Sequence, residues 1–137
     1  MTTDTVVGRI STIIASAPYS MLRADEPFSF DLQPSQNLDQ VFCLLAESDE
    51  VTAYLGYAQA QIDRLTIRLA RKINSDPHGT VSQLYLDVHS LASTIIRDGT
   101  AGDYNAVVRS WTIPHPQDRD NFAVAEIEVL ADYDRAL

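Results

Sequence analysis

The sequence predicts an α+β domain in which a mainly antiparallel sheet packs against two helices. Three observations carry this prediction: an alternating pattern from Ile62 to Leu69, a long amphipathic segment at about 77–97, and two more alternating segments at 104–113 and 122–133. The stretch from Gln61 to Tyr104 is therefore predicted to be a strand, a helix and a return to strand. We expect the rest of the chain to pack against this unit.

Length and composition favour one soluble domain. A chain of 137 residues can bury roughly 70% of its unfolded surface around a single core. Its 45% hydrophobic and 21% charged residues are ordinary for a globular protein, and no apolar run reaches the ~20 residues of a membrane-spanning helix. The start of the chain lacks the basic and apolar regions of a secretory signal, so we expect synthesis for the cytosol.

The charge of the chain limits its binding partners. The formal net charge of −9 is carried by scattered acidic residues, which argues against tight binding to nucleic acid. An acidic surface suits a channel through which DNA slides, but it suits an ordinary soluble protein equally well, and the charge alone favours the second interpretation. The one cysteine, Cys43, lies in an apolar run and is expected to be a small buried side chain rather than a reactive thiol.

The first predicted helix covers residues 4–16. Thr3 or Asp4 can cap its first turn, and Pro18 ends the segment. The apolar residues recur at helical spacing in a narrow stripe: Val6, Val7, Ile10, Ile13 and Ile14. Such a stripe is typical of a helix that lies on a sheet.

Residues 18–37 are predicted to form a long arm with one short edge strand at Phe28–Leu32. The arm contains three of the six prolines and several turn-forming residues. Phe28 and Phe30 share one side of an extended strand, so both need a partner surface, which is either the protein's own core or another subunit. In an assembly protein such an arm is a natural contact with a neighbour.

Two segments follow that can pair as a hairpin. Gln40–Ala46 is predicted to be a strand because it contains a continuous apolar run. The acidic segment Glu47–Glu50 is predicted to be the turn. Val51–Gln61 fits helix or strand, and we assign it mostly to strand.

The strand at 61–72 is predicted to be buried on one side only. One face carries the apolar residues Leu65, Ile67 and Leu69. The other face carries Arg64, Thr66 and Arg68. The arginines can serve as a ligand site, although glutamates on a neighbouring strand are a simpler explanation for them.

The long helix is the best-defined element of the sequence. Asp76 is its expected cap, with Pro77 at the first helical position. Arg97, Asp98 and Gly99 supply a basic last turn and a glycine stop. Its apolar stripe recurs at steps of three and four residues: Val81, Leu84, Tyr85, Val88, Leu91, Ala92, Ile95 and Ile96.

The last two strands are predicted to form a long antiparallel hairpin. The core face of the second strand is expected to carry Ala123, Ala125, Ile127, Val129, Ala131 and Tyr133. Glu126 and Glu128 share the opposite face. If this strand lies near residues 61–72, these glutamates can pair with Arg64 and Arg68 across the strands.

The loop at about 114–121 joins the two strands of this hairpin. It is too long for a tight turn and too polar to be buried, so we expect it to project from the domain. It contains His115 and a charged tip. The candidate interface residues of the whole chain are Phe28, Phe30, Arg64, Arg68, His115, Asp118, Arg119, Asp120, Glu126 and Glu128.

Local motifs for chemistry are absent from the sequence. No glycine-rich phosphate loop, dinucleotide fingerprint, nucleophile elbow or calcium loop occurs. His78 and His89 lie about 16 Å apart on one helix, too far to ligate one metal ion. Trp111 is expected in the core or as an interface anchor. We therefore assign no catalytic, cofactor-binding or metal-binding residue.

The order of elements resembles that of a tail terminator, or a related tail-completion protein, of tailed bacteriophages. The shared order is a short N-terminal helix, a proline-rich excursion, strands, a helix opened by Asp76 and Pro77, and a terminal hairpin. The likeness covers nearly the whole chain. It includes Ile62–Ile73, Val81–Ile96 and the stretch from Trp111 to Val129, and it involves no motif.

This resemblance implies a virion structural protein without catalytic residues or cofactor, made in the host cytoplasm. Such subunits assemble into a hexameric ring that caps the head-proximal end of the tail tube and joins it to the neck. The implied partners are the tail tube protein and neck or head-completion proteins. DNA passes through the lumen, and no membrane is involved.

Two other classes remain open on the sequence. Another neck or tail-tube subunit shares the same assembly logic, and a tube protein would polymerise into open stacks. A small enzyme or ligand-binding domain without a recognisable motif can use the same sheet and helix. Activity that depends on His89 or His115 would favour this last class.

Overall fold

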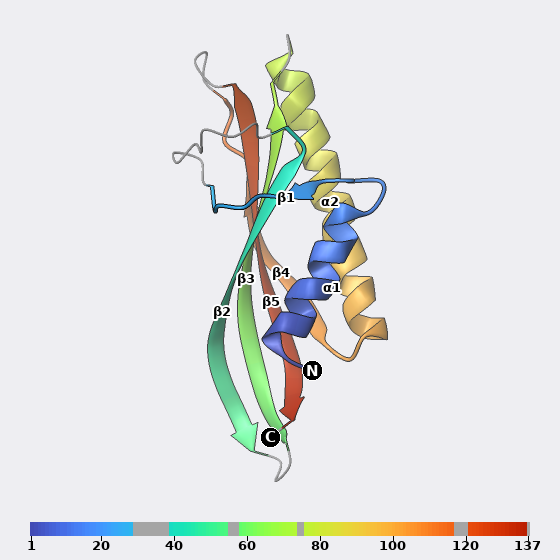
Figure 1. Cartoon of the computed structure of the whole chain (residues 1–137), viewed down its shortest axis with the longest axis vertical. Coiled ribbons are helices and arrows are strands. Elements are labelled where there is room, and N and C mark those ends of the chain that lie inside the picture. The colour runs from blue at the N-terminus through green and yellow to red at the C-terminus, as the bar shows by residue number, and fades with distance from the viewer. Residues whose placement is uncertain (29–38, 55–57, 74–75, 117–120, 137) are drawn as a thin grey trace.

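The structure is a computed structural model that describes residues 1–28, 39–54, 58–73, 76–116 and 121–136. This part of the chain forms one five-stranded sheet with two helices on one face, which confirms the predicted α+β class (Figure 1). In chain order the elements are α1 (Thr3–Ala15), β1 (Leu22–Arg23), β2 (Val41–Tyr54), β3 (Ala58–Lys72), α2 (Pro77–Ala101), β4 (Asn105–Thr112) and β5 (Phe122–Ala136).

The sheet has the strand order β1-β2-β3-β5-β4. All neighbouring strands are antiparallel except β1 and β2, which are parallel. The central pair, β3 and β5, is in continuous register from Ala58 opposite Ala136 to Lys72 opposite Phe122. The outer pairs are less regular: the register shifts between Ser48 and Glu50 in β2, and between Val108 and Ser110 in β4.

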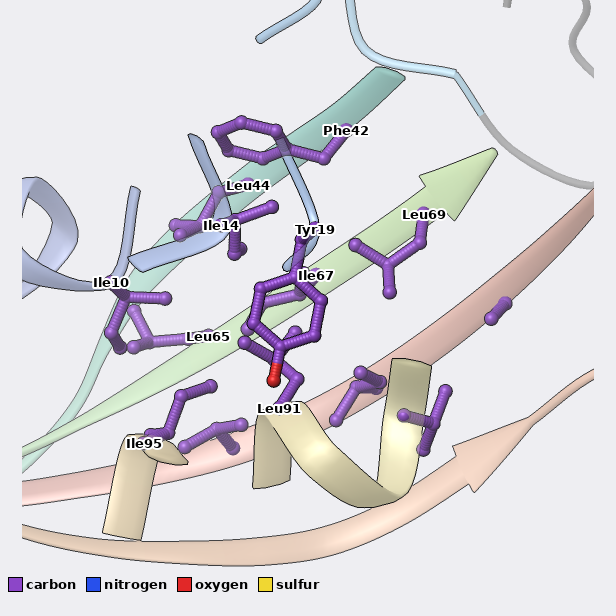
Figure 2. Packing of buried hydrophobic residues seen from close by; sticks show 14 of the residues in the cluster. Ile10, Ile14, Tyr19, Phe42, Leu44, Leu65, Ile67, Leu69, Leu91 and Ile95 are labelled. Carbon is purple, nitrogen blue, oxygen red and sulfur yellow. The ribbon is translucent and has the colours of Figure 1, made fainter. Parts of the chain in front are cut away.

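The hydrophobic core lies between the two helices and one face of this sheet (Figure 2). Leu65, Ile67 and Leu69 of β3 are fully buried, as their alternation predicts. All six residues predicted for the core face of β5 are also buried. Burial of one Leu or Ile side chain contributes about 1.5–3 kcal/mol, so these central strands anchor the fold.

Helix α1 begins one residue earlier than predicted. Its cap is Thr2, whose hydroxyl accepts a hydrogen bond of 3.2 Å from the Thr5 amide, rather than Thr3 or Asp4. Asp4 instead lies in the first turn, where a negative charge is favourable. The buried stripe of the helix consists of Val6, Ile10 and Ile14.

The described part of the 18–37 arm contains a short edge strand that was not predicted, Leu22–Arg23, which pairs with Val41 and Phe42. The predicted strand Phe28–Leu32 falls almost wholly within residues 29–38, which lie outside the described part of the chain, so it stays a prediction. The pairing depends on tertiary contact, because the Leu22 amide donates to the Gln40 carbonyl (3.0 Å) and the Ala24 amide to the Phe42 carbonyl (2.8 Å).

The acidic segment Glu47–Glu50 is not a turn, which corrects the prediction. It lies inside β2, with Glu47 opposite Arg64 and Ser48 opposite Asp63. The long neighbouring strand β3 offers backbone partners here, and ladder pairing with an irregular register outweighs the local turn preference. Val51–Tyr54 continues β2, and β3 starts at Ala58, so the strand assignment for this region holds where it is described.

Helix α2 starts as predicted but continues past Gly99 to Ala101. Pro77 occupies the first position and Asp76 the cap, although the Asp76 side chain makes no capping hydrogen bond. Gly99 is buried inside the helix because the Tyr104 carbonyl approaches it closely: an added Cβ would lie 2.7 Å from that oxygen. The helix ends instead at Gly102, whose amide donates to the Gly99 carbonyl at 3.1 Å.

Candidate subunit interface

The face of the sheet opposite the helices carries a ladder of charged side chains. Because side chains alternate along each strand, the residues between the core positions of β3 and β5 point to this face. Three ion pairs lie on it among the described residues: Arg64 with Glu47 (2.7 Å), Arg68 with Glu126 (2.9 Å) and Arg109 with Glu128 (3.3 Å). We call this the open face.

One of the two predicted charge pairs between β3 and β5 forms, and the other does not. Arg68 and Glu126 lie opposite each other in the β3–β5 register and form an ion pair, as expected. Arg64 lies opposite Leu130 on that side and pairs with Glu47 of β2, whereas Glu128 pairs with Arg109 of β4. The correction has a simple cause: the register of a long antiparallel ladder decides which charges meet, and a sequence pattern determines only the face.

Phe28 contacts the protein's own core, one of its two predicted partner surfaces. It is 0% exposed and packs with Val41, Cys43, Ala70 and Val124, which together cover one end of the open face. Its carbonyl accepts a hydrogen bond of 2.9 Å from Arg68. Phe28 therefore has no exposed surface to offer another subunit, and Phe30 lies outside the described residues.

His115 lies beside the start of helix α2. Its ring centroid is 5.0 Å from that of His78, and both residues are exposed. This contact, between the 114–121 loop and the helix, was not anticipated from the sequence. The charged tip of the loop, Asp118, Arg119 and Asp120, lies outside the described residues and stays a prediction.

An exposed aromatic cluster lies where α2 meets the edge strand β4. Trp111 packs edge-on against Tyr85 and His89, with ring centroids 5.4 Å apart in both contacts. Trp111 is 40% exposed and Tyr85 is 39% exposed, so neither is a core residue. The predicted stripe of α2 was too wide: its buried centre is Leu84, Val88, Leu91 and Ile95, and Tyr85 and Ile96 lie on its exposed flank.

Both outer edges of the sheet are largely unpaired among the described residues. β4 pairs with β5 on one side, and no strand in the described ranges pairs with its other side. On the opposite edge, β1 is the one described strand that pairs with β2, at Val41 and Phe42. Backbone N–H and C=O groups on such edges are available to another chain.

A buried polar cluster beneath the start of α1 was not predicted. Asp63 is 0% exposed, and its carboxylate accepts hydrogen bonds from Gln61 (2.7 Å) and from the Tyr133 hydroxyl. Thr3 is joined to Tyr133 by a hydrogen bond of 3.0 Å. The alternation of β3 could have predicted that Asp63 is buried, because Asp63 is two residues before Leu65 and must share its face.

A second polar cluster joins the two helices. The Arg9 guanidinium binds the Asp98 carboxylate, and this hydrogen bond is the main cause that holds the pKa of Asp98 below its ordinary value. Tyr104 donates to the same carboxylate at 2.7 Å. Burial, followed by that hydrogen bond, raises the pKa of Tyr104, so the phenol stays protonated at neutral pH.

Within the described ranges, no three His, Cys, Asp or Glu side chains gather where they could hold one metal ion. His89 faces Trp111, and His78 faces His115, so the two helix histidines occupy separate places. A search of the described helices finds none with the length and apolarity to cross a membrane. The candidates for contact with other chains are the open face and the two outer edges of the sheet, β2 and β4.

The chain was also compared with known proteins. No protein-family model matches it, and no curated protein matches it.

Proposed function

We propose that this protein is a structural subunit of a tailed bacteriophage, namely the tail terminator, which forms a hexameric ring at the head-proximal end of the tail tube and joins it to the neck. The position in the virion comes from the resemblance in element order. The observation that carries the ring is the sheet, whose two described outer edges are largely unpaired and belong to different strands.

Two different surfaces on opposite sides of a subunit favour a ring. When one surface of a copy binds the other surface of the next copy, the contact is heterologous, and repetition closes into a ring or continues as a filament. The terminator role requires closure, because a ring has a fixed number of subunits and offers its two ends to the tube and the neck.

The charge of the chain suits a ring through which DNA passes. Each copy has a formal net charge of −9, so six copies carry −54. Negative charge repels the phosphate backbone, which allows DNA to slide without strong binding. Within the ring, the open face and the 114–121 loop are the candidates for contact with the tail tube protein and the neck proteins.

Mass measurement of the purified protein is the first test. Native mass spectrometry should find monomers or single closed rings, with monomers assembling into a ring when tail tube ends are added. Long tubes of this chain alone would contradict a terminator and favour a tail-tube subunit.

Localisation in the virion is the decisive test. Cryo-electron microscopy of the phage that encodes this chain should place one ring at the junction between head and tail. A stop codon early in its gene should give tail tubes of uncontrolled length, because nothing then ends their growth. Density for this chain elsewhere in the particle, or normal tails in its absence, would refute the proposal.

A further inference from the structure

We propose that neighbouring copies join through their sheet edges: the outer edge of β4 pairs, in antiparallel orientation, with the outer edge of β2 of the next copy. The sheet then continues from subunit to subunit around the ring. This inference rests on the proposed ring and names the surfaces that close it.

The two edges offer complementary lengths of free backbone. In β4, Asn105–Thr112, every residue except Arg109 at the register shift pairs with β5, and no second strand pairs with β4 within the described chain. On the other edge, β1 pairs with the first two residues of β2, and no described strand covers β2 from Cys43 to Tyr54. An exposed strand edge is a template for another strand, so each subunit presents one such template on each side.

The direction of the strands determines how the edges meet. Three successive antiparallel pairings lead from β2 through β3 and β5 to β4, so β2 and β4 run in opposite directions. A sheet that continues smoothly into the next copy keeps the direction of its strands. The β4 strand of one copy therefore meets the next copy's β2 strand antiparallel, and antiparallel ladders are the slightly more stable type.

Charge favours this pairing over pairing between identical edges. The β2 sequence contains Glu47, Asp49 and Glu50 and no basic residue, whereas the β4 sequence contains Arg109 and no acidic residue. The Arg109 side chain is 59% exposed. Glu47 and Arg109 each have a partner in their own subunit and are still exposed to solvent, so pairing β4 with β2 can bring Arg109 of one copy near Glu47 of the next, whereas pairing β2 with β2 brings two acidic strands together.

Exposed apolar side chains flank both edges. On β4, Val107 is 58% exposed on the open face, and Trp111 is exposed on the helix face beside Tyr85. On β2, Leu45 is also exposed and points to the open face. These side chains would be covered when the edges join. Burial of apolar surface on both faces of the sheet would then stabilise the contact between copies.

Disulfide trapping tests the pairing directly. In the double variants V107C/L45C and V107C/E47C, all new cysteines lie on the open face of an edge strand. Mild oxidation of the assembled ring should give at least one of the two pairs a ladder of covalent multimers up to the ring size. The native Cys43 is buried, and the wild-type protein and the single variants control for its participation.

The variant V107C/T66C is the matched control. Thr66 points to the same open face but belongs to β3, which is covered at its edges by β2 and β5. Edge-to-edge pairing predicts no cross-link for this variant. Cross-linking through Thr66 would instead show that copies stack on the open face, and dimers from V107C alone would show β4 pairing with itself; both outcomes overturn the inference.

A second measurement needs no variant. Trp111 is the single tryptophan of the chain, so its fluorescence reports this edge alone. Ring assembly should shift its emission to shorter wavelength and reduce its quenching by acrylamide.

The two proposals fail in different ways. A closed ring at the head-tail junction without these cross-links and without the fluorescence change refutes the edge pairing and leaves the terminator role intact. Open filaments with the expected cross-links refute the terminator role and leave the edge pairing intact. A chain that stays monomeric even with tail tube ends refutes both.

Discussion

The Arg9 guanidinium and the Asp98 carboxylate form two hydrogen bonds, from Nε to Oδ2 at 3.0 Å and from Nη2 to Oδ1 at 2.8 Å. Arg9 belongs to α1 and Asp98 to α2, so the pair joins the two helices that cover the sheet. Tyr104 donates to the same carboxylate and connects this junction to the start of β4.

This junction predicts how stability depends on acid. The pKa of Asp98 is lowered in the folded state, mainly by the hydrogen bond from Arg9, so its contribution to stability is present above the unfolded pKa of about 4 and is lost as the pH falls through the lower folded pKa. Asp98→Asn should lower the melting temperature at neutral pH and flatten its decline below about pH 4. Thermal melts across this range check it, with exposed Asp25→Asn as the control. An unchanged acid profile in the Asp98 variant would contradict the prediction.

Two glycines in helices should respond to alanine in opposite directions. A Cβ at Gly99 would lie 2.7 Å from the Tyr104 carbonyl oxygen, which is backbone and cannot move aside, so Gly99→Ala should destabilise the protein by about 1–3 kcal/mol. At Gly8 in α1 the added Cβ would meet no atom within 4 Å apart from the chain neighbours and backbone of its own helix, so Gly8→Ala should stabilise by about 0.5–1 kcal/mol. Urea denaturation measures both changes, and equal effects of the two substitutions would argue against the close approach at Gly99.

The buried polar cluster should be sensitive to loss of one hydroxyl. Tyr133→Phe removes a donor to the Asp63 carboxylate, which is fully buried, and should cost about 1–3 kcal/mol. Tyr85→Phe removes a hydroxyl from an exposed ring and should change stability by no more than about 0.5 kcal/mol. The free energies of unfolding of the two variants give the comparison. Similar small losses for both would mean that the Asp63 cluster is not a stabilising part of the core.

The charged residues of the open face should differ in importance. Arg68 contacts both Glu126 and the Phe28 carbonyl and is mostly buried, so Arg68→Ala should destabilise by about 1–3 kcal/mol. Arg109 is exposed and its ion pair with the half-buried Glu128 is longer, so Arg109→Ala should cost less than about 1 kcal/mol. Denaturant unfolding of dilute, monomeric protein tests this ranking. Raised salt should weaken the contribution of Arg109 more than that of Arg68, and the reverse order would contradict the assignment.

Local sequence patterns predicted correctly which side chains of the central strands are buried in the core. The alternation of Leu65, Ile67 and Leu69, and of the β5 core residues, predicted the buried faces. Successive side chains of a strand point to opposite faces, so once one face is covered the pattern fixes which residues are buried. The start of α2 at Asp76 and Pro77 was also predicted correctly, because it depends on the residues at the helix start themselves. Predictions failed where a contact outside the helical or strand pattern intervened, as at Gly99, which the Tyr104 carbonyl just beyond the helix approaches, and at Glu47–Glu50, where β3 supplies pairing partners.

The candidate interface was the least predictable part. The sequence placed Arg64, Arg68, Glu126 and Glu128 on one face, but their partners depend on register. The exposed cluster of Trp111, Tyr85 and His89 brings together residues from an edge strand and a helix flank. No local pattern distinguishes such a flank residue from a core residue at the same helical spacing.

The sequence alone therefore determined the class of the fold, the two helices, the central strands and the face to which each of their side chains points, because these follow from periodicity and capping within short segments. Tertiary structure decided the strand order, the charge partners, the burial of Phe28, and which edges stay largely unpaired among the described residues. Each of these depends on contacts between segments distant in the chain, which a local pattern does not encode.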